Sequence, residues 1–396
     1  LHEVKIVENT AWSCVHGVGR WKESCGCDTG AHSDWNQNWR KPLREALDWL
    51  RDLITPQFES AAGRLVHEPW AARDAYIDVL LDHSETSRLK FLRDHTLKPL
   101  SRNQEVRLWK MLEMMRHAML MYTSCGWFFD DLSGIETIQV IQYAGRVVQL
   151  AEELFGAPVE ATFLEHLSKA VSNIPEQGDG ARIYARFVKP NIVDLEKLGA
   201  HYAISSLFEN YTEETQIYCY SAQRTDYRLI EAGKLRLALG RAAFTSSITQ
   251  EWKDLAFGVL HFGDHNLTGG VRQFQGDEAY QELVTQAGDA FYRADVPEVI
   301  RLIDRGFGTN IYSLKSLFRD EQRNLVDRIL KTTIEEAESA YRGVYEHHAP
   351  LMRFLHGLKL PTPRVFQHAA GVALNAMLRK AFDARPFDVE RVRTLL

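Results

Sequence analysis

Three cysteines and a histidine near the start of the chain are the residues whose types point most directly to chemistry. Cys14, His16, Cys25 and Cys27 lie close together in the stretch "SCVHGVGRWKESCGC". Thiolate sulfur and imidazole nitrogen are preferred ligands of Zn²⁺, and four of them close a tetrahedral structural site. The spacing departs from the common zinc patterns, because a single residue separates Cys25 from Cys27 and no second paired knuckle follows. The sequence therefore leaves a zinc site and buried free thiols as open interpretations, and it assigns no cofactor.

The same stretch is rich in aromatic and charged side chains. Trp12, His16, Arg20 and Trp21 are interspersed with glycines, which let the backbone approach a ligand closely. Aromatic rings stack on the apolar face of a sugar, while charged groups hydrogen-bond its hydroxyls in a partly dry site. The spacing of Trp12, His16 and Arg20 also fits a helix whose tryptophans anchor a core. Sugar binding and core packing are both compatible with this pattern.

Two further stretches combine tryptophans with polar side chains. "HSDWNQNWRKPLRE" holds Trp35 and Trp39, and "TSCGWFFDD" holds Trp127 followed by Asp130 and Asp131. We interpret the tryptophans as rings that stack on a sugar and the aspartates as hydrogen-bond acceptors for its hydroxyls. The alternatives are tryptophans that pack in a core and carboxylates that are stabilised by the N-terminus of a helix. The two aspartates are not expected to be a glycosidase pair, because adjacent side chains do not bracket a sugar bond.

Signatures of several other enzyme classes are absent from the sequence. No Gly-rich phosphate loop, GxSxG elbow or HExxH motif occurs. The segment "GDHNLTGG" places Asp264 and His265 close after His261, and this group would suit a metal or a ligand. A polar hairpin turn is the preferred interpretation of that segment.

Composition excludes some classes of partner. The 396 residues hold 47 Lys and Arg against 53 Asp and Glu, and no basic track is interleaved with aromatic residues, so nucleic acid is not expected. No apolar run approaches the roughly 18 residues of a membrane-spanning helix, and the first residues lack the pattern of a signal peptide. The five cysteines are too few and odd in number for a secreted disulfide framework. These features predict a soluble protein of the cytoplasm.

Apolar periodicity predicts helices over most of residues 1–210. "KPLREALDWLRDLI" places four apolar side chains on one helical face, and "QEVRLWKMLEMMRHAMLMY" repeats the pattern. In the stretch after Trp127, Ser133 and Glu136 fit a capping box that opens a long helix ending near Gly156. The apolar faces of the first and third helices comprise Leu43, Leu47, Leu50 and Ile54, and Ile141, Ala144, Val148, Ala151 and Phe155.

The pattern of residue types in the sequence changes after about residue 215. Strand-forming residues dominate between about 215 and 275, where Leu235, Leu237 and Leu239 alternate with Lys234, Arg236 and Ala238. This pattern predicts an antiparallel sheet of four or five strands, after which helices resume. The predicted fold is α+β and mainly α, and it lacks the βα alternation of a (β/α) barrel. Three successive parts are expected: a helical domain at 1–210, a β region at 211–278 and a C-terminal helical region at 279–396.

Three of the quoted motifs resemble a known family. "NTAWSCVHGVGRWKESCGC", "WNQNWRKPLREALDWL" and "SCGWFFDDLSGIETIQVIQYA" resemble the domain of unknown function numbered 3536, which follows the catalytic barrel in glycoside hydrolase family 57-like proteins. The resemblance extends through the sheet region to "YSLKSLFRDEQRNLVDRIL" and so covers nearly the whole chain. Because the chain begins at Leu1, within ten residues of the first motif, we expect further N-terminal material in the natural polypeptide.

The resemblance implies a role in carbohydrate metabolism. Barrels of family 57 supply a Glu nucleophile and an Asp acid/base for retaining hydrolysis or transfer on α-glucans, and helices that follow the barrel close over its mouth. No stretch here resembles the His-Gln-Pro motif or the catalytic Glu of that barrel, so no catalytic residue is assigned. The chain would complete the cleft of a retaining α-glycosidase or glucanotransferase, with an α-linked oligo- or polysaccharide and the upstream barrel as partners.

The residues and the resemblance together predict a set of substrate contacts. This set comprises Trp12, His16, Arg20, Trp21, Trp35, Trp39, Trp127, Asp130 and Asp131. A rival hypothesis is a structural or interaction module in which Cys14, His16, Cys25 and Cys27 bind zinc and the tryptophans are core. A third is an enzyme that acts by itself through Asp130 or Asp131.

Overall fold

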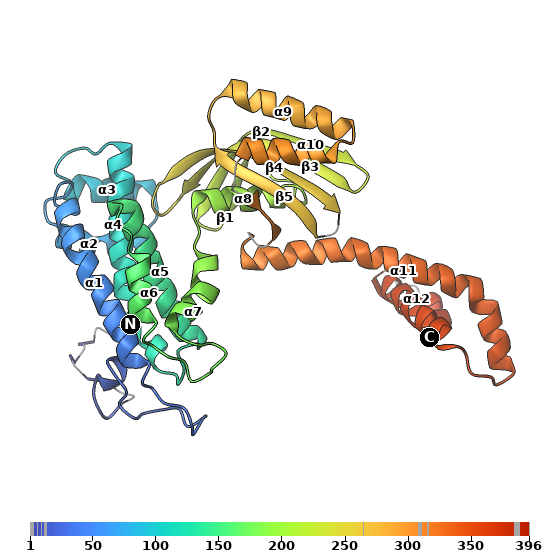
Figure 1. The fold of residues 1–396 in the computed structure, drawn as a ribbon, viewed down its shortest axis with the longest axis horizontal. Coiled ribbons are helices and arrows are strands. Elements are labelled where there is room, and N and C mark those ends of the chain that lie inside the picture. The colour runs from blue at the N-terminus through green and yellow to red at the C-terminus, as the bar shows by residue number, and fades with distance from the viewer. Residues whose placement is uncertain are drawn as a thin grey trace. The chain divides into compact units, whose positions relative to one another are not determined.

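The computed structural model describes residues 4–5, 7–8, 10–11, 14–263, 265–307, 311–314, 317–383 and 389–395 (Figure 1). By their mutual contacts the residues form two compact units. Unit 1 comprises Leu1–Leu198, Thr212–Thr225 and Ala242–Leu255, and unit 2 comprises Gly199–Tyr211, Asp226–Arg241 and Ala256–Leu396. The division into three successive parts that the sequence suggests, at 1–210, 211–278 and 279–396, stays a prediction.

Unit 1 is built mainly from helices. The first of them, α1, confirms the predicted apolar face, since Leu43, Leu47, Leu50 and Ile54 are all fully buried. Pro42 lies in the first turn of α1, where its missing N–H breaks no helical hydrogen bond. The helices of unit 1 are α1 Arg40–Ala62, α2 Pro69–Leu81, α3 Glu85–His95, α4 Arg102–Leu120, α5 Ile135–Phe155, α6 Glu160–Leu167 and α7 Gly180–Ile183. Short helical turns are η1 Gly19–Trp21, η2 Ser124–Trp127, the π-helical η3 Tyr184–Val188 and η4 Lys189–Asn191.

The start of α5 differs from its prediction, and its end agrees. Gly156 follows the helix with a φ of 71°, a left-handed conformation that glycine adopts at no steric cost. At the other end, Gly134 rather than Ser133 precedes the first helical residue, and no side chain caps the helix. Ser133 is instead engaged by Asp131, whose Oδ1 accepts the backbone N–H at 2.8 Å and the hydroxyl at 2.6 Å. The predicted capping box is therefore wrong, because Asp131 rather than Glu136 accepts the N–H of Ser133 and the helix begins one residue later than expected.

The core of unit 1 lies between α1, α4 and α5, which pack side by side (Figure 1). Trp39, Trp109 and Trp127 are among its largest fully buried side chains. The methionines of α4 are core residues as well: Met111, Met114 and Met115 are all buried. Two of the tryptophans that the sequence singles out as candidate sugar contacts, Trp39 and Trp127, thus belong to the core between these helices.

An antiparallel sheet confirms the predicted β region. Its strands follow one another in chain order, and β1 pairs with β2 so that Ile217 faces Tyr220. Its sixth strand, which the sequence did not indicate, pairs its Tyr312 with Gly269 at the edge of the sheet. The strands are β1 Glu214–Ile217, β2 Tyr220–Ala232, β3 Leu235–Ser246, β4 Trp252–Gly263, β5 Asn266–Gln273 and β6 Ile311–Tyr312.

In unit 2, helices pack on the strands. Leu237 and Leu239 of β3 share a hydrophobic cluster with residues of α9 and α10, which lie along the strands (Figure 1). The expected alternation along β3 is not observed, since Leu237, Ala238, Leu239 and Gly240 are all buried. A side chain at Gly240 would collide with Phe257, whose ring packs edge-on against Tyr202 at 5.8 Å. Both faces of β3 are therefore covered. The other helices are α8 Leu195–Ser205, α9 Asp277–Tyr292, α10 Val296–Phe307, α11 Arg319–Gly357, α12 Arg364–Asp383 and α13 Val389–Leu395.

These elements make the described chain an α+β, mainly α fold, as the sequence predicts. The described residues contain no (β/α) barrel. None of the helices in those residues combines the length and the apolar composition needed to cross a bilayer.

Candidate metal centre

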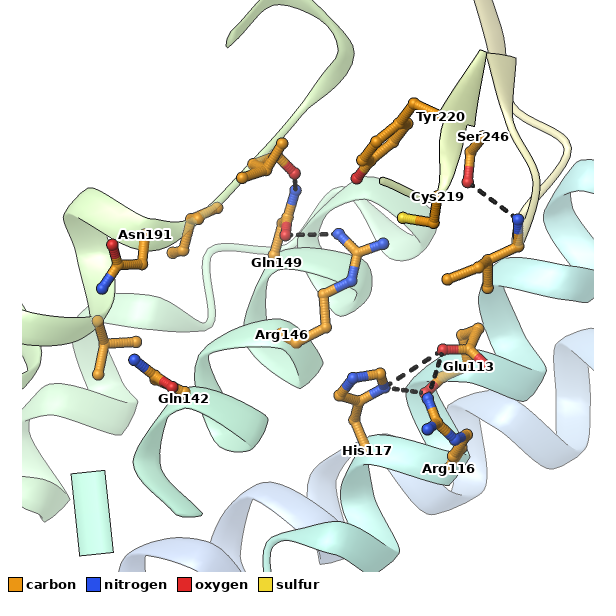
Figure 2. A pocket seen from close by; sticks show the side chains of 14 residues that line it. Glu113, Arg116, His117, Gln142, Arg146, Gln149, Asn191, Cys219, Tyr220 and Ser246 are labelled. Carbon is orange, nitrogen blue, oxygen red and sulfur yellow. Dashed lines mark hydrogen bonds and ion pairs between the residues drawn. The ribbon is translucent and has the colours of Figure 1, made fainter. Parts of the chain in front are cut away.

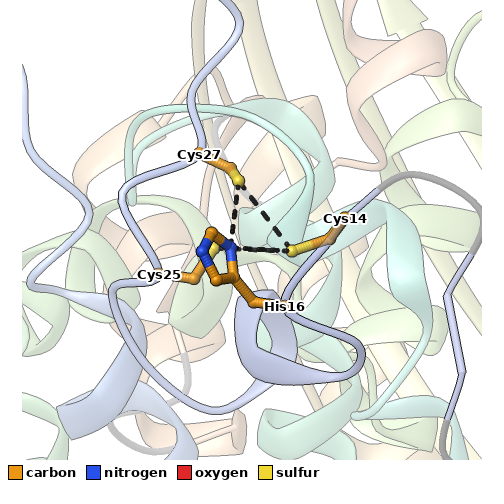
Figure 3. A group of neighbouring side chains, drawn as sticks. All are labelled: Cys14, His16, Cys25 and Cys27. Atoms are coloured by element: carbon orange, nitrogen blue, oxygen red, sulfur yellow. Dashed lines mark hydrogen bonds between the residues drawn. The ribbon is translucent and has the colours of Figure 1, made fainter.

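Two groups of converging polar side chains in unit 1 are candidates for function. One lines a cavity between α4, α5 and the turns that join β1 to β2 and β3 to β4 (Figure 2). The other is the cluster of Cys14, His16, Cys25 and Cys27, which we call the Cys/His cluster (Figure 3). The cluster has the donor atoms of a metal site.

The four donor atoms of the Cys/His cluster all lie within 4.8 Å of one another. Cys14 Sγ lies 3.7 Å from Cys25 Sγ and 3.9 Å from Cys27 Sγ. The imidazole Nδ1 of His16 lies 3.7 Å from Cys14 Sγ and 3.5 Å from Cys27 Sγ. All five cysteines of the chain are free, so no disulfide holds these atoms together. The side chains point toward one common centre (Figure 3).

Tight turns in the backbone bring these side chains together. The N–H of Gly17 donates to the carbonyl of Cys14 at 3.2 Å, and the N–H of Gly19 donates to the carbonyl of His16 at 3.2 Å. Gly26, between the last two cysteines, has a φ of 78°, which an L side chain rarely adopts. These turns thus bring four donor atoms together, although the spacing of their residues in the sequence matches no common zinc pattern.

Burial differs across the cluster. Cys14 is buried, Cys25 and Cys27 are half-buried, and His16 is exposed. Cys14 thus sits against the protein, whereas the imidazole of His16 is open to solvent. Such a position leaves a path by which a metal ion can enter.

Two arginines are buried next to the cluster. Arg40 has no exposed surface, and its guanidinium donates to the carbonyls of Cys27 and Phe129, each at 3.3 Å. Arg20 is also buried and lies over the ring of Phe128 at 4.8 Å. Burial lowers the pKa of Arg40, as does Arg20, while Cys25 and Asp130 raise it. A buried cation is stable only beside negative charge or good acceptors.

The thiols of the cluster influence one another. Burial raises the pKa of Cys25, but the backbone N–H of Cys27 and the thiols of Cys14 and Cys27 outweigh this effect, so the pKa falls below its ordinary value. The pKa of Cys27 is raised, first by its hydrogen bond with Cys25 and then by burial. Cys25 is thus the cluster thiol whose surroundings favour the thiolate, which is the form that binds metal.

Asp130 and Asp131 are acceptors for loop backbone and hydroxyl groups. Both are 5% exposed. Asp130 accepts hydrogen bonds from Thr29, and Asp131 accepts them from Ser133, from the hydroxyl of Ser172 at 2.8 Å and from the N–H of Asn173 at 2.6 Å. The carboxylates therefore hold loops together. This engagement disfavours both their predicted contact with sugar hydroxyls and the hypothesis of an enzyme that acts through them.

Trp39 and Trp127 occupy the core. They are 1% and 0% exposed, and their rings stack at 6.5 Å. The indole N–H of Trp39 donates to the carbonyl of Asp130 at 3.1 Å. Neither ring presents a face to solvent, so the structure places both in a packing role and provides no surface for the predicted stacking on a sugar.

The remaining predicted contacts lie nearer the surface. Trp21 is half-buried and donates its indole N–H to the carbonyl of Ser124 at 3.3 Å. Trp35 is half-buried and stacks on the exposed ring of His32, with ring centroids 3.8 Å apart. His16 belongs to the Cys/His cluster, and Arg20 is buried beside it. Trp12 lies outside the described residues.

The segment around His261 is a hairpin, as preferred from the sequence. β4 ends at Gly263 and β5 begins at Asn266, so the turn includes His265. His261 is buried in β4, where its ring packs edge-on against Phe208 at 5.1 Å. Asp264 lies outside the described residues. No metal-binding group forms at this turn among the residues that are described.

Sequence reasoning missed several residues that shape these sites. Arg40 is the first residue of α1, and nothing in its local sequence pattern indicates that it is fully buried. Arg146 and His117, which line the cavity of Figure 2, lie on α5 and α4 without a distinguishing motif. Polar residues on the inner side of an amphipathic helix are the one available signal, and it is a weak one.

Comparison with known proteins identifies a family. A protein-family model described as "Domain of unknown function (DUF3536)" matches residues 35–318, which confirms the resemblance seen in the motifs. The matched region begins after Cys27 and so does not include the Cys/His cluster. The comparisons with curated proteins and with solved structures found no match.

Proposed function

The chain belongs to the DUF3536 family, and we propose that it carries a structural zinc ion bound by Cys14, His16, Cys25 and Cys27. The observation that carries this proposal is the arrangement of the four donor atoms. In a tetrahedron the distance between corners is about 1.63 times the distance to the centre, so typical zinc bonds of about 2.3 Å to sulfur imply sulfurs about 3.8 Å apart. Cys14 Sγ lies 3.7 and 3.9 Å from the other two sulfurs.

The histidine fits the same tetrahedron. With zinc bonds of about 2.3 Å to sulfur and about 2.0 Å to nitrogen, a sulfur and a nitrogen should lie about 3.5 Å apart. His16 Nδ1 lies 3.5 and 3.7 Å from two of the sulfurs. Three sulfurs and one imidazole favour zinc over magnesium or calcium, which prefer oxygen ligands.

Charge supports the proposal. A zinc ion with three thiolates and a neutral imidazole carries a net charge of −1. Arg40 and Arg20 are buried beside the cluster, and the Nε atom of each has no hydrogen-bond partner in the described structure. An anionic metal centre would supply the negative charge that makes these two buried cations stable. The N–H of Cys27, which bonds Cys25, would likewise stabilise a thiolate.

The proposed role of the metal is structural. Four protein ligands leave no open position for a substrate or a reactive water, as a catalytic zinc ion requires. The cluster would hold the segment from Cys14 to Cys27 in its turns, and the following residue Thr29 bonds Asp130. The metal therefore stabilises the attachment of this segment to the helices of unit 1. Zinc thiolates also fit the reducing cytoplasm that we expect for the protein.

A wider role belongs to the same proposal and rests on the family resemblance. The chain would be the C-terminal domain of a glycoside hydrolase family 57-like protein, with the catalytic Glu and Asp in an upstream barrel. Its partners would be that barrel and an α-linked oligo- or polysaccharide. The observation that favours a sugar contact is Trp35, a half-buried ring stacked on exposed His32 near the cluster-bearing segment.

Metal analysis of the purified chain tests the zinc site. We expect one zinc ion per chain by mass spectrometry of the metal content, and a loss of zinc in Cys14→Ser and Cys27→Ser. Cys125→Ser is the matched control, because this exposed cysteine lies outside the cluster and its variant should keep the metal. If the wild-type protein contains no zinc as purified, it is refolded in the presence of zinc. A protein that is still metal-free after this step would refute the site.

Titration of maltooligosaccharides into the full-length protein tests the wider role. We expect Trp35→Ala to weaken binding about fivefold, since stacking of one ring on a sugar contributes on the order of 1 kcal/mol. Trp252→Ala is the control, because this exposed tryptophan lies elsewhere, under the guanidinium of Arg102. Equal weakening by both variants, or by neither, would argue against a sugar contact at Trp35.

A further inference from the structure

A cavity of about 320 Å³ lies in unit 1, apart from the Cys/His cluster (Figure 2). Its lining comes from several elements of unit 1. α4 contributes Glu113 and His117, α5 contributes Arg146, and the turn before β2 contributes Cys219. The volume is at the lower end of the range for ligand pockets, which suits a molecule the size of a monosaccharide rather than a polymer.

The one carboxylate in the lining is already neutralised. Glu113 is 2% exposed, accepts a hydrogen bond from the hydroxyl of Tyr76 at 2.8 Å and pairs with Arg116 at 3.2 Å. His117 Nδ1 lies 2.9 Å from the backbone carbonyl of Glu113. Burial lowers the pKa of His117, which favours the neutral form of its ring. These groups add no net charge to the cavity.

Arg146 is the charged side chain of the cavity lining that has no ion-pair partner among the described residues. Its Nη1 donates to the neutral amide oxygen of Gln149 at 2.6 Å, and within the described residues no carboxylate forms an ion pair with it. The acidic residues on the neighbouring elements are used elsewhere, because Glu153 and Glu251 both pair with Lys110, at 2.9 and 2.8 Å. A half-buried guanidinium that faces a cavity without a counter-ion is poised to bind an anion in a two-point contact.

The groups around Arg146 are neutral and polar. The hydroxyl of Tyr220 and the thiol of Cys219 lie on the side of the cavity opposite His117 (Figure 2). Burial raises the pKa of Tyr220 to about 12, and it also raises the pKa of Cys219, so neither group competes as an anion. Gln142 and Asn191 add amide groups at the other end of the cavity (Figure 2). Such groups hydrogen-bond hydroxyls and ester oxygens.

We propose that this cavity binds a small hydroxylated organic anion, in which a phosphate monoester or a carboxylate pairs with Arg146 and the hydroxyls contact Tyr220 and the amides of Gln142 and Asn191. The site does not depend on the metal centre, so the two proposals fail or succeed separately. Both ligand types share the charged oxygens that a guanidinium recognises, and the experiment separates them.

The test is calorimetric titration of the full chain with four probes: glucose 6-phosphate, glucuronate, inorganic phosphate and uncharged glucose. We expect saturable binding of glucose 6-phosphate or glucuronate, weaker binding of inorganic phosphate and none of glucose. Binding of glucose 6-phosphate without glucuronate assigns the site to phosphate monoesters, and the reverse assigns it to carboxylates. Absence of binding by all three anions overturns the proposal.

Two variants connect the binding to Arg146. Arg146→Gln removes the charge and should weaken binding of the anion at least tenfold, while Arg146→Lys keeps the charge and should retain part of the affinity. Arg93→Gln is the matched control, because this exposed arginine on α3 pairs with Asp94 and is remote from the cavity lining. Far-ultraviolet circular dichroism of each variant verifies its fold. Anion binding that Arg146→Gln leaves unchanged would overturn the proposal.

Discussion

Thr29 donates its backbone N–H to both carboxylate oxygens of Asp130, at 3.0 and 3.1 Å, and its hydroxyl bonds the same carboxylate. Thr29 follows the last cysteine of the Cys/His cluster closely, whereas Asp130 belongs to the motif that leads into α5. This contact joins two of the sequence motifs across 101 positions of the chain. The contact holds the segment from Cys14 to Thr29, which contains the short turn η1 but no α-helix or strand, against the helices of unit 1.

Asp130→Asn is expected to destabilise unit 1 by about 2 to 3 kcal/mol, because hydrogen bonds to a buried charged acceptor are among the stronger ones. Thr29→Val removes only the hydroxyl donor and should cost less. Urea unfolding of both variants and of the double variant measures the coupling energy between the two positions. If the losses of unfolding free energy in the two single variants add up to the loss in the double variant, the contact between Thr29 and Asp130 contributes nothing. Asp34→Asn, at an exposed position, serves as the control.

Removal of zinc with a chelator is expected to loosen the segment that carries the cluster and leave the helices folded. The core of unit 1 is made from α1, α4 and α5 and contains no ligand of the proposed site. Trypsin should then cleave after the exposed Lys22, while circular dichroism retains its helical signal. Addition of zinc should restore protection. Equal rates of cleavage with and without chelator would contradict this expectation.

Trp127→Ala and Trp35→Ala are expected to have very different effects on stability. Trp127 is 0% exposed, and truncation of such a core tryptophan costs about 3 to 5 kcal/mol. Trp35 is half-buried and rests on an exposed histidine, so its loss should cost about 1 kcal/mol or less. Chemical denaturation measures both values. A small effect of Trp127→Ala would remove the packing role assigned to this residue.

His201 makes unit 2 sensitive to acid. Its ring is 1% exposed and stacks on Phe318 at 4.4 Å, and burial lowers its pKa from 6.5 to about 4. Because the folded-state pKa lies below the unfolded value, the stabilisation is complete above pH 6.5 and is lost as the pH falls toward 4. The total is on the order of 3 kcal/mol.

Urea unfolding between pH 7.5 and 4.5 measures the effect of His201. His201→Phe keeps an aromatic ring against Phe318 and removes the titrating group, so its stability should fall less over this interval. His265→Phe, in the hairpin turn, is the control, and it should keep the slope of the wild type. Identical slopes for wild type and His201→Phe would show that another group dominates.

Several elements could be predicted because their signals are local. The apolar spacing of α1 depends only on the helical repeat, and the end of α5 depends on the conformational freedom of Gly156. The antiparallel sheet follows from strand-forming residues between turn residues. The capping box at Ser133 failed because Asp131, only two residues away, accepts both hydrogen bonds.

The candidate sites depend on contacts that sequence spacing does not encode. Tryptophan is a residue type that stacks on sugars, yet Trp39 and Trp127 stack on each other in the core. The cavity around Arg146 is formed by α4, α5 and two turns of the sheet, which are distant from one another along the chain.

The sequence by itself determined the helical and β regions, the membership of the family and the residue types that can bind zinc. Only the tertiary structure decided which of these residues face a ligand, because exposure and charge balance depend on neighbours brought together by folding. The Cys/His cluster shows both contributions. Its donor atoms are evident from the sequence, but their approach to within 4.8 Å of one another and the two buried arginines beside them arise from the turns of the chain and its packing on the helices of unit 1.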